Sequence, residues 1–382
     1  MKFFATAARG TEPALRDELR ELGFAGVRAD RGGVHFEGEE REGYRACLWS
    51  RIALRVLAPL ASFDAGNERA LYDGVRAIDL DAVLTPKQTL VVSAVTRSSR
   101  LTHTEYLCQL TKDAVVDRIR DARGARPSVS KRDADVHLYL HLARDVATLY
   151  LDLAGETLNR RGFRERGAEA PLKETLAAAL LRYSSWDRQG PLADPLCGSG
   201  TLLIEAGLWS KDVAPGRTRR LFGFERWASF DRRAQVELRE LREAAHAAEL
   251  PKAAPLFGRD VSGEVLALAR SSSARGGFDV RFEQGALRDA HFEGGAAIVA
   301  NPPYGRRLER SADLGKELAR LADRHPDSHV ALLLDAEQPL ARTRRRPGPP
   351  RDVYNGNIAC VVRTWLAREA GGESGEFDRE PA

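Results

Sequence analysis

The sequence is poor in cysteine and has no long apolar run. Its four cysteines are scattered, with no CxxC pair and no histidine cluster beside them. This spacing is typical of a reducing cytoplasm and gives no ligand set for a metal ion. The longest apolar runs, such as residues 330–334, are far too short to cross a bilayer. Charged residues from Arg9 onward interrupt the apolar start, so we expect no signal peptide and a cytoplasmic protein without a membrane partner.

Lysine is also scarce, and the overall charge is nearly balanced. The chain has 59 Lys and Arg residues against 55 Asp and Glu, a net charge of +4, and only eight of the basic residues are lysine. A GC-rich genome explains this arginine usage, so the overall charge does not by itself indicate a nucleic-acid partner. The length of 382 residues predicts two or three domains, and a 43% hydrophobic content is enough for their cores.

Two short stretches carry the chemistry, and the first contains a glycine loop. Apolar residues lead into Asp194, a turn follows from Gly198 to Gly200, and an apolar helix begins at Thr201. The pattern predicts a strand, a tight loop and a helix. Glycine lets the backbone approach a ligand closely, and a helix N-terminus offers free N–H groups. Dinucleotides and S-adenosylmethionine both use this geometry.

The second stretch lies about a hundred residues later, where an apolar strand ends in Asn301-Pro302-Pro303-Tyr304. The side-chain oxygen of Asn301 and the carbonyl of Pro302 are two acceptors on a backbone that proline stiffens. Two acceptors suit the two hydrogens of an exocyclic NH2 group, and Tyr304 supplies a ring on which a base can stack. The two stretches together predict an amino-group methyltransferase, with Asn301, Pro302, Pro303 and Tyr304 as its catalytic residues.

The identity of the cofactor is narrowed by Asp260, which ends the second strand of the predicted parallel sheet. A carboxylate at this point accepts hydrogen bonds from a ribose diol. In NAD enzymes the acid lies about 20 residues past the glycines, whereas Asp260 lies about 60 residues past Gly200. S-adenosylmethionine is therefore favoured over NAD, with Asp194 placed to hold its ammonium group.

The chain also resembles a known family over nearly its whole length. The opening Ala8-Arg9-Gly10-Thr11-Glu12, residues 45–155 and the Asn355-Gly-Asn-Ile-Ala-Cys360 strand are similar to the bacterial THUMP-containing enzymes that make N2-methylguanosine in large-subunit rRNA. The resemblance implies a Rossmann-like class I methyltransferase domain, a mostly parallel sheet with an antiparallel closing strand. An α+β ferredoxin-like and THUMP module that binds RNA would precede it.

This resemblance and the periodicity of the sequence predict the division of the chain. The periodicity of the N-terminal region predicts an α+β fold built from two small sandwiches. The expected parts are 1–44 (ferredoxin-like), 45–155 (THUMP), 156–175 (basic linker and cofactor-lining segment), 176–368 (methyltransferase) and 369–382 (disordered tail).

The resemblance adds cofactor contacts. The segment before the glycine loop lines the methionine end of the cofactor in that family, so Leu172, Lys173 and Thr175 are candidates. After the third strand the family usually has Gly-Asp, with the Asp accepting from the adenine amino group. This chain has Gly285-Ala286, so Asp289 or the backbone would have to replace that contact. The expected cofactor residues are Leu172, Thr175, Asp194, Pro195, Cys197, Gly198, Ser199, Gly200, Thr201, Asp260, Val261, Ala286 and Asn301.

Basic residues cluster in two places that suit RNA. Arg160, Arg161 and Arg164 surround Gly162 and Phe163, and such interleaving binds phosphates and stacks on bases. Two further arginines directly follow Tyr304, where they could hold phosphates flanking the target base. The expected RNA-binding residues are Arg160, Arg161, Arg164, Arg306 and Arg307.

Several functions remain open. The motif at Asn301 is shared by adenine-N6 methyltransferases of DNA and RNA and by glutamine methyltransferases of release factors. The α+β N-terminal region with repeated strands favours an RNA substrate, which is rRNA or tRNA. A non-catalytic RNA-binding or ribosome-assembly protein is another class, and the intact Asp194, Gly198, Gly200, Asp260 and Asn301 argue against it. We expect one activity and a monomer.

Overall fold

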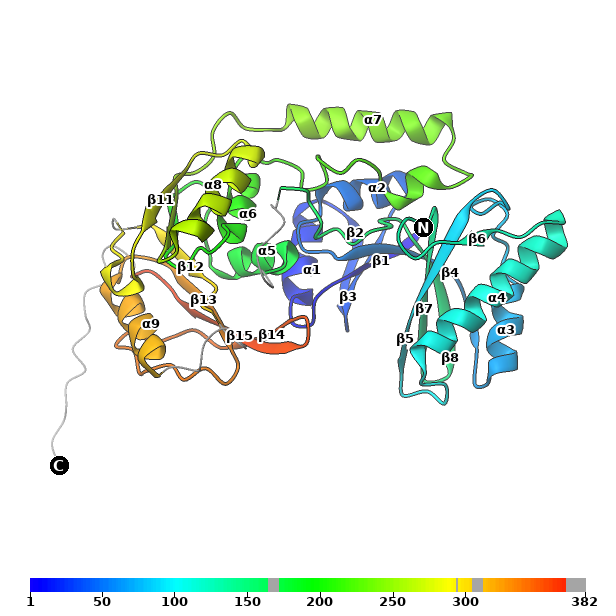
Figure 1. Ribbon diagram of the computed structural model, residues 1–382, viewed down its shortest axis with the longest axis horizontal. Helices are drawn as coiled ribbons and strands as arrows, with labels where there is room; N and C mark the ends of the chain where they lie inside the picture. Colours follow the sequence, from blue (N-terminus) through cyan, green and yellow to red (C-terminus); the bar gives the residue numbers. More distant parts are fainter. Residues whose placement is uncertain (164–171, 293–294, 304–311, 369–382) are drawn as a thin grey trace. The chain divides into compact units, whose positions relative to one another are not determined.

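A computed structural model describes residues 1–163, 172–292, 295–303 and 312–368. The chain divides into two compact units, which are described separately (Figure 1). The first consists of Met1–Gly162, Lys173–Ala179 and Asp212–Leu250. The second consists of Phe163–Leu172, Leu180–Lys211 and Pro251–Ala382.

The first unit contains one eight-stranded sheet in the order β2-β3-β1-β4-β8-β7-β5-β6. Its strands are β1 (Lys2–Thr6), β2 (Ala25–Asp30), β3 (Gly33–Glu37), β4 (Arg55–Asp64), β5 (Thr89–Arg97), β6 (Ser128–Val129), β7 (Val136–Ala143) and β8 (Val146–Asp152). The prediction of two small sandwiches was wrong, because β4 pairs with β1 over residues 55–57 and with β8 over residues 57–64. This one long strand joins the ferredoxin-like and THUMP parts into a continuous sheet.

Helices pack against one face of this sheet. They are α1 (Glu12–Glu21), α2 (Glu40–Trp49), α3 (Glu68–Arg76) and α4 (Thr104–Arg123), and α3 and α4 lie side by side (Figure 1). The helix α1 begins with proline in its first turn and buries Leu15 and Leu19 at helical spacing. Along β7 the residues alternate between buried and half-buried, as expected for a strand covered on one face only.

Residues 212–250 also belong to the first unit, although the sequence placed them within the methyltransferase part. The Arg51 guanidinium donates to the carbonyl of Val213 at 2.8 Å. The ring of Tyr44 stacks on Phe224, with the ring centroids 4.0 Å apart. The segment carries η1 (Gly223–Arg226) and α7 (Arg232–Ala247), and α7 lies along α2 (Figure 1).

The second unit contains a seven-stranded sheet in the order β11-β10-β9-β12-β13-β15-β14. Its strands are β9 (Leu192–Asp194), β10 (Leu256–Asp260), β11 (Val280–Gln284), β12 (Ala297–Ala300), β13 (Val330–Asp335), β14 (Arg351–Asn355) and β15 (Ile358–Trp365). The first five strands pair in parallel, and β15 is antiparallel to both β13 and β14. This confirms the predicted parallel sheet with an antiparallel closing strand.

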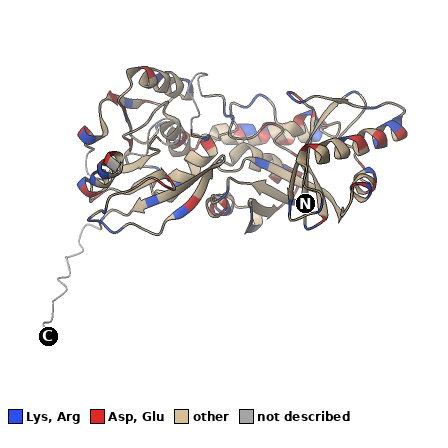
Figure 2. Ribbon diagram, turned by 60° about the horizontal axis from the view of Figure 1, so that its bottom comes forward, with Lys and Arg blue, Asp and Glu red and all other residues tan. Residues whose placement is uncertain are grey.

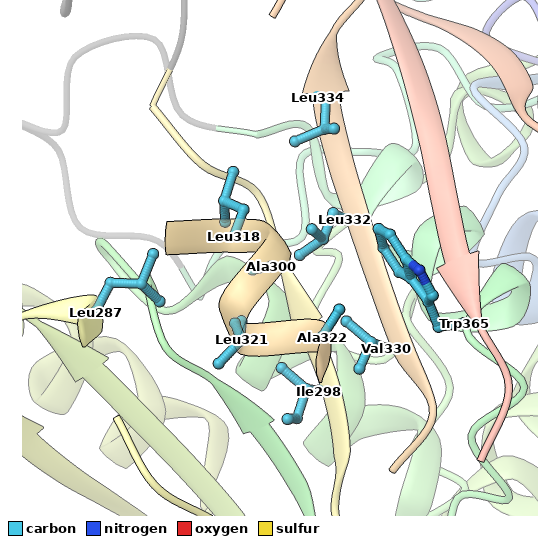
Figure 3. Close-up of a cluster of buried hydrophobic side chains, with 10 residues drawn as sticks. All are labelled: Leu287, Ile298, Ala300, Leu318, Leu321, Ala322, Val330, Leu332, Leu334 and Trp365. Atoms are coloured by element: carbon cyan, nitrogen blue, oxygen red, sulfur yellow. The ribbon is translucent and has the colours of Figure 1, made fainter. Parts of the chain in front are cut away.

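The helices of the second unit include α6 (Thr201–Ser210), α8 (Gly263–Gly276) and α9 (Ala312–Arg324), with a short turn η2 (Leu287–Asp289). Helix α5 (Glu174–Tyr183) contributes its residues up to Ala179 to the first unit and the rest to the second. A buried cluster joins β12 to its neighbours, with Ile298 and Ala300 packing near Val330, Leu332 and Trp365 (Figure 3). This core holds the end of β12 in place.

Charges of both signs are interspersed along the ribbon (Figure 2). All four cysteines are free thiols. Within the described ranges, no group of three or more His, Cys, Asp or Glu side chains could hold a metal ion. No helix in this part of the chain has the length and apolarity needed to cross a membrane.

Candidate cofactor and catalytic site

Three neighbouring strands of the second unit bring the predicted residues to one edge of its sheet. The first two, β9 and β10, end in Asp194 and Asp260, and Asn301 directly follows β12. The strand β9 lies between β10 and β12, and all three run parallel. Since the carboxyl ends of parallel strands meet at one edge, sequence motifs about a hundred residues apart converge there.

The glycine loop after β9 has the geometry that glycine permits. Gly198 and Gly200 have φ angles of +52° and +82°, in the left-handed region that side chains disfavour. A Cβ atom added at Gly198 would meet no atom within 4 Å, so the backbone there borders open space. Gly200 is the N-cap of α6 and has no side chain to cap the helix.

The carboxylate of Asp260 joins two segments of the site. Its Oδ2 accepts from the Gly198 N–H at 2.9 Å, and its Oδ1 accepts from the Ser262 N–H at 3.0 Å. The next residue, Val261, is 63% exposed, which is unusual for a large apolar side chain. A carboxylate beside an exposed apolar surface suits a ribose attached to a planar base.

Asp194 is almost completely buried, with 1% of its surface exposed. Its Oδ1 accepts from the Leu196 N–H at 3.1 Å. Burial raises the pKa of this carboxyl, the Leu196 N–H lowers it, and the negative charge of Asp260 adds a smaller rise, so that the pKa is raised to about 8. A nearby cation would reverse this effect, because an opposite charge favours the ionised form.

Asn301 provides an unused acceptor at the end of β12. Its Oδ1 is buried and has no hydrogen-bond partner among the described residues. A buried polar atom without a partner is costly and calls for an explanation, such as a ligand absent from the structure. Pro302 is buried and Pro303 is half-buried. The predicted contacts at Tyr304, Arg306, Arg307 and Arg164 lie outside the described residues.

At Ala286, where the family usually has an aspartate, the backbone is held by an arginine. The Nε of Arg259 donates to the Ala286 carbonyl at 3.1 Å, and Arg259 also pairs with Glu283 at 3.0 Å. Sequence analysis missed Arg259, although its position next to Asp260 could have suggested it. The side chain of Asp289 is 62% exposed and lies 3.9 Å from the Arg288 guanidinium, so it remains available for another contact.

The other predicted cofactor residues differ in placement. Leu172 belongs to the second unit and is buried, whereas the buried Thr175 belongs to the first unit. Their contact with the cofactor stays a prediction, as does that of the exposed Lys173. The remaining predicted residues are Pro195, Cys197 and Ser199, which lie between Asp194 and α6, and Thr201, which is the first residue of α6.

The predicted RNA contacts at residues 160 and 161 also differ from each other. Arg160 is exposed and pairs with Glu156 at 3.1 Å. Arg161 is only 3% exposed, and its guanidinium donates to the Arg51 carbonyl. This burial does not fit the expected phosphate contact and indicates a structural role instead.

The sheet order, the glycine loop after the first strand and the Asn-Pro-Pro turn after the fourth together define a class I methyltransferase fold. S-adenosylmethionine is the cofactor of this class. The open space at Gly198, the acceptors of Asp260 and the exposed Val261 fit its amino acid, ribose and adenine parts.

Comparison with known families agrees with this class. Residues 161–363 match the RMKL-like methyltransferase domain, 2–57 match the RlmL ferredoxin-like domain, and 65–152 match the THUMP domain. The chain therefore belongs to the RMKL-like methyltransferase family. These matches divide the two N-terminal parts between residues 57 and 65, later in the chain than the boundary at 44/45 that we expected.

Similar proteins include the "Ribosomal RNA large subunit methyltransferase K/L" of Syntrophotalea carbinolica, 41% identical over 94% of this chain and 53% of the relative. The protein with the same description in Methylococcus capsulatus is 40% identical over 94% of this chain and 50% of its own length. The chain thus spans about half the length of these curated relatives. The solved structure of SMU.472 complexed with SAH is 27% identical, with a TM-score of 0.84 over 96% of this chain and 98% of that one.

Proposed function

We propose that this chain transfers a methyl group from S-adenosylmethionine to the exocyclic N2 amine of a guanine in structured RNA, and that this RNA is 23S rRNA. The observation that carries the proposal is the buried, unpartnered Oδ1 of Asn301, which follows β12, the strand next to β9. This atom needs a donor with a free N–H, and an exocyclic NH2 group supplies one.

The chain's own residues would act by positioning. The amine of guanine is a weak nucleophile, because its lone pair is delocalised into the ring. Acceptance of its two hydrogens by Asn301 Oδ1 and the Pro302 carbonyl would turn that lone pair out of the ring plane and toward the bound methyl donor. No strong base is needed for this, since orientation and electrostatics supply the catalysis. The cofactor supplies an electrophilic methyl group.

The target base must leave its stack to reach the turn at Asn301. Unstacking costs a few kcal/mol, and it costs least where the base is already unpaired. Stacking on Tyr304 would offset part of this cost, on the order of 1–3 kcal/mol. The proposal therefore favours a guanine in a loop or at a helix end of the RNA.

RNA as the partner is supported by the first unit. Residues 65–152 match the THUMP domain, and the curated relatives carry a name that specifies large-subunit rRNA. Because this chain spans only half of those relatives, their substrate is carried over here as part of the proposal. We further propose that the protein is monomeric and cytoplasmic. The four free thiols support the cytoplasmic location.

The test incubates purified protein with labelled S-adenosylmethionine and unmodified rRNA, tRNA or double-stranded DNA, followed by nucleoside analysis. We expect label in N2-methylguanosine from rRNA. Label in tRNA would change the substrate and retain the chemistry. Label in N6-methyladenosine would overturn the choice of base. RNA binding and cofactor binding without any transfer would favour a ribosome-assembly protein instead.

A further inference from the structure

One face of the eight-stranded sheet lies opposite its helices and carries aromatic and basic side chains. None of these side chains has a role in the methyl transfer proposed above. Strand pairing defines its members. Phe4 is opposite His35 on one side and Leu57 on the other. Leu57 is opposite Asp152, which is two residues from Tyr150, and Tyr150 is opposite Tyr139. Directly opposite residues, and residues two apart on one strand, point to the same face of a sheet. This register therefore places Phe4, His35, Leu57, Tyr139 and Tyr150 on one face.

The alternate residues of the same strands face the helices. Phe3 and Ala5 of β1 are fully buried, as are Leu138 and Leu140 of β7. In contrast, Phe4, His35, Tyr139 and Tyr150 are only half-buried. The sheet therefore has one face in the core and one face, opposite its helices, on which these rings remain partly exposed while Leu57 and Asp152 are buried; we call it the open face.

This open face is hollowed into a cavity of about 870 Å³. Four arginines line it, namely Arg31, Arg55, Arg97 and Arg144, and Asp30 is its only acidic lining residue within the described part of the chain. Arg55 is held by an ion pair with Asp152. The guanidinium groups of Arg31, Arg97 and Arg144 form no ion pair in the described ranges, and all three side chains are exposed.

The aromatic residues occupy two pairs of opposite positions on neighbouring strands. Phe4 and His35 have centroids 4.8 Å apart and tilted by 49°. Tyr139 and Tyr150 are opposite each other in the β7–β8 register. The strands β1 and β8 are separated by β4 alone, so these two strands, which carry Phe4 and Tyr150, lie on the order of 10 Å apart across the sheet. Val95, which is 37% exposed, adds apolar surface beside them.

We propose that this open face binds unpaired nucleotides of the RNA substrate, with bases stacked on the Tyr139–Tyr150 and Phe4–His35 pairs and phosphates held by Arg31, Arg97 and Arg144. The inference rests on the proposed RNA substrate and gives it a binding surface. Rings on an open sheet beside free cations are suited to single strands, because every base has a π-face and the stack needs no particular sequence. A duplex keeps its bases inside and would meet only the cations.

The test measures binding of the full chain to a short unstructured RNA and to a blunt RNA duplex by fluorescence anisotropy. Substitution of both tyrosines, Tyr139→Ala with Tyr150→Ala, should weaken single-strand binding about 5- to 150-fold for each base that no longer stacks. The conservative pair Tyr139→Phe with Tyr150→Phe should bind like the wild type, since the rings remain. The matched control is Tyr106→Ala on α4, a 45%-exposed tyrosine outside the cavity, which should change nothing.

The arginines are tested by salt dependence. In the double variant Arg97→Gln with Arg144→Gln, the negative slope of log affinity against log salt should become shallower by about 0.7 for each phosphate that is no longer neutralised. The tyrosine variants should keep the wild-type slope. Arg126→Gln, an exposed arginine outside the cavity, is the control. An equal weakening of duplex and single-strand binding in the tyrosine variants would overturn the proposal, as would unchanged binding.

A further measurement does not depend on the folding of any variant. Ultraviolet crosslinking of the wild-type chain to the single-stranded RNA should map to the peptides containing Tyr139, Tyr150 or Phe4. Crosslinks confined to other peptides would overturn the proposal. Binding is scored separately from methyl transfer, so a chain that binds single strands but methylates none of the unmodified rRNA, tRNA or DNA substrates would refute the proposed function and keep this site.

Discussion

The carboxylate of Asp260 accepts a hydrogen bond at 2.9 Å from the backbone N–H of Gly198, so the acid that ends β10 holds the glycine loop that follows β9. The same side chain accepts from the Ser262 N–H. Asp260 thus orders both segments that border the proposed ribose position. In the proposed site, Asp260 would therefore act on the cofactor both directly and through the shape of the loop.

The first prediction is that Asp260→Ala weakens binding of S-adenosylmethionine about 10- to 150-fold, since hydrogen bonds to a charged group contribute about 1.5–3 kcal/mol. Isothermal calorimetry measures the change. The control Asp279→Ala removes an exposed carboxylate from the residue before β11 and should have no effect. Unchanged affinity in a folded Asp260 variant would contradict the assignment.

Much of this site was predictable, because its residues sit at strand ends that local patterns mark. Apolar runs ending in Asp194, Asp260 and Asn301 define three strands, and parallel strands present their carboxyl ends together. The pairing within the first unit was not predictable in this way. Periodicity predicts a long strand over residues 52–63, close to the observed β4, but it does not show that β4 pairs with both β1 and β8. Such non-local pairing depends on packing across the whole sheet.

Burial of long polar side chains was equally hidden from the sequence. Arg161 lies in a basic run that indicates a solvated surface, yet its guanidinium bonds to a backbone carbonyl from residue 51. Conversely, the sequence predicts residues 136–142 and 146–152 as a strand pair, and the register of that pair places Tyr150 opposite Tyr139. Sequence therefore identified which residues are polar or aromatic, and tertiary pairing determined which of them meet.

The second prediction concerns pH and Asp194, whose carboxyl has a pKa raised to about 8 by burial. Below this pH the carboxyl is protonated in the free protein. The ammonium group of the cofactor would favour the carboxylate, so binding would lower this pKa and release a proton. Affinity should then rise with pH up to about 8, with a limiting slope of one log unit per pH unit, and become flat above it.

The measurement is calorimetry from pH 6 to 9 on the wild type and on Asp194→Asn, which cannot titrate. The α-amino group of the ligand titrates in the same range, at about 7.7–8.0. The titration of the free ligand enters both affinities, so their ratio reports the part that depends on the Asp194 carboxylate. A ratio that stays constant with pH would show that Asp194 does not face the ammonium group.

The third prediction uses two glycines with similar backbone but different surroundings. Gly198 has φ +52° and Gly277, at the end of α8, has φ +72°, and a Cβ at either would meet no atom within 4 Å. Alanine at each should lower the free energy of unfolding by about 1–2 kcal/mol through left-handed strain. Only Gly198→Ala should also weaken cofactor binding, because its methyl group would enter the ligand space. Chemical denaturation and calorimetry report the two effects, and equal cofactor affinities in both variants would contradict the loop's role.

The fourth prediction is that Ala286→Asp tightens cofactor binding about 5-fold, the equivalent of about 1 kcal/mol for one added hydrogen bond. Ala286 is extended, with φ −78° and ψ 155°, and it caps η2, a position that aspartate favours. The backbone should therefore accept the change. The gain should be absent with the inosine analogue of the cofactor, which lacks the adenine amino group. Weaker binding by a folded variant would indicate that another group, such as Asp289, already occupies the position.

The fifth prediction separates catalysis from binding at Asn301. Asn301→Ala should retain cofactor and RNA affinity and lower kcat about 10²–10³-fold, on the scale of removing one preorganised group that acts in the transition state. Asn301→Asp keeps an acceptor oxygen at the same place and should recover part of the rate, which a purely structural role of the amide would not predict. Single-turnover methyl transfer at saturating RNA measures the rate, and thermal unfolding checks that both variants are folded. If the alanine variant turns over at the wild-type rate, the unpartnered oxygen at the end of β12 is not the acceptor for the reacting amine, and the mechanism proposed above is wrong.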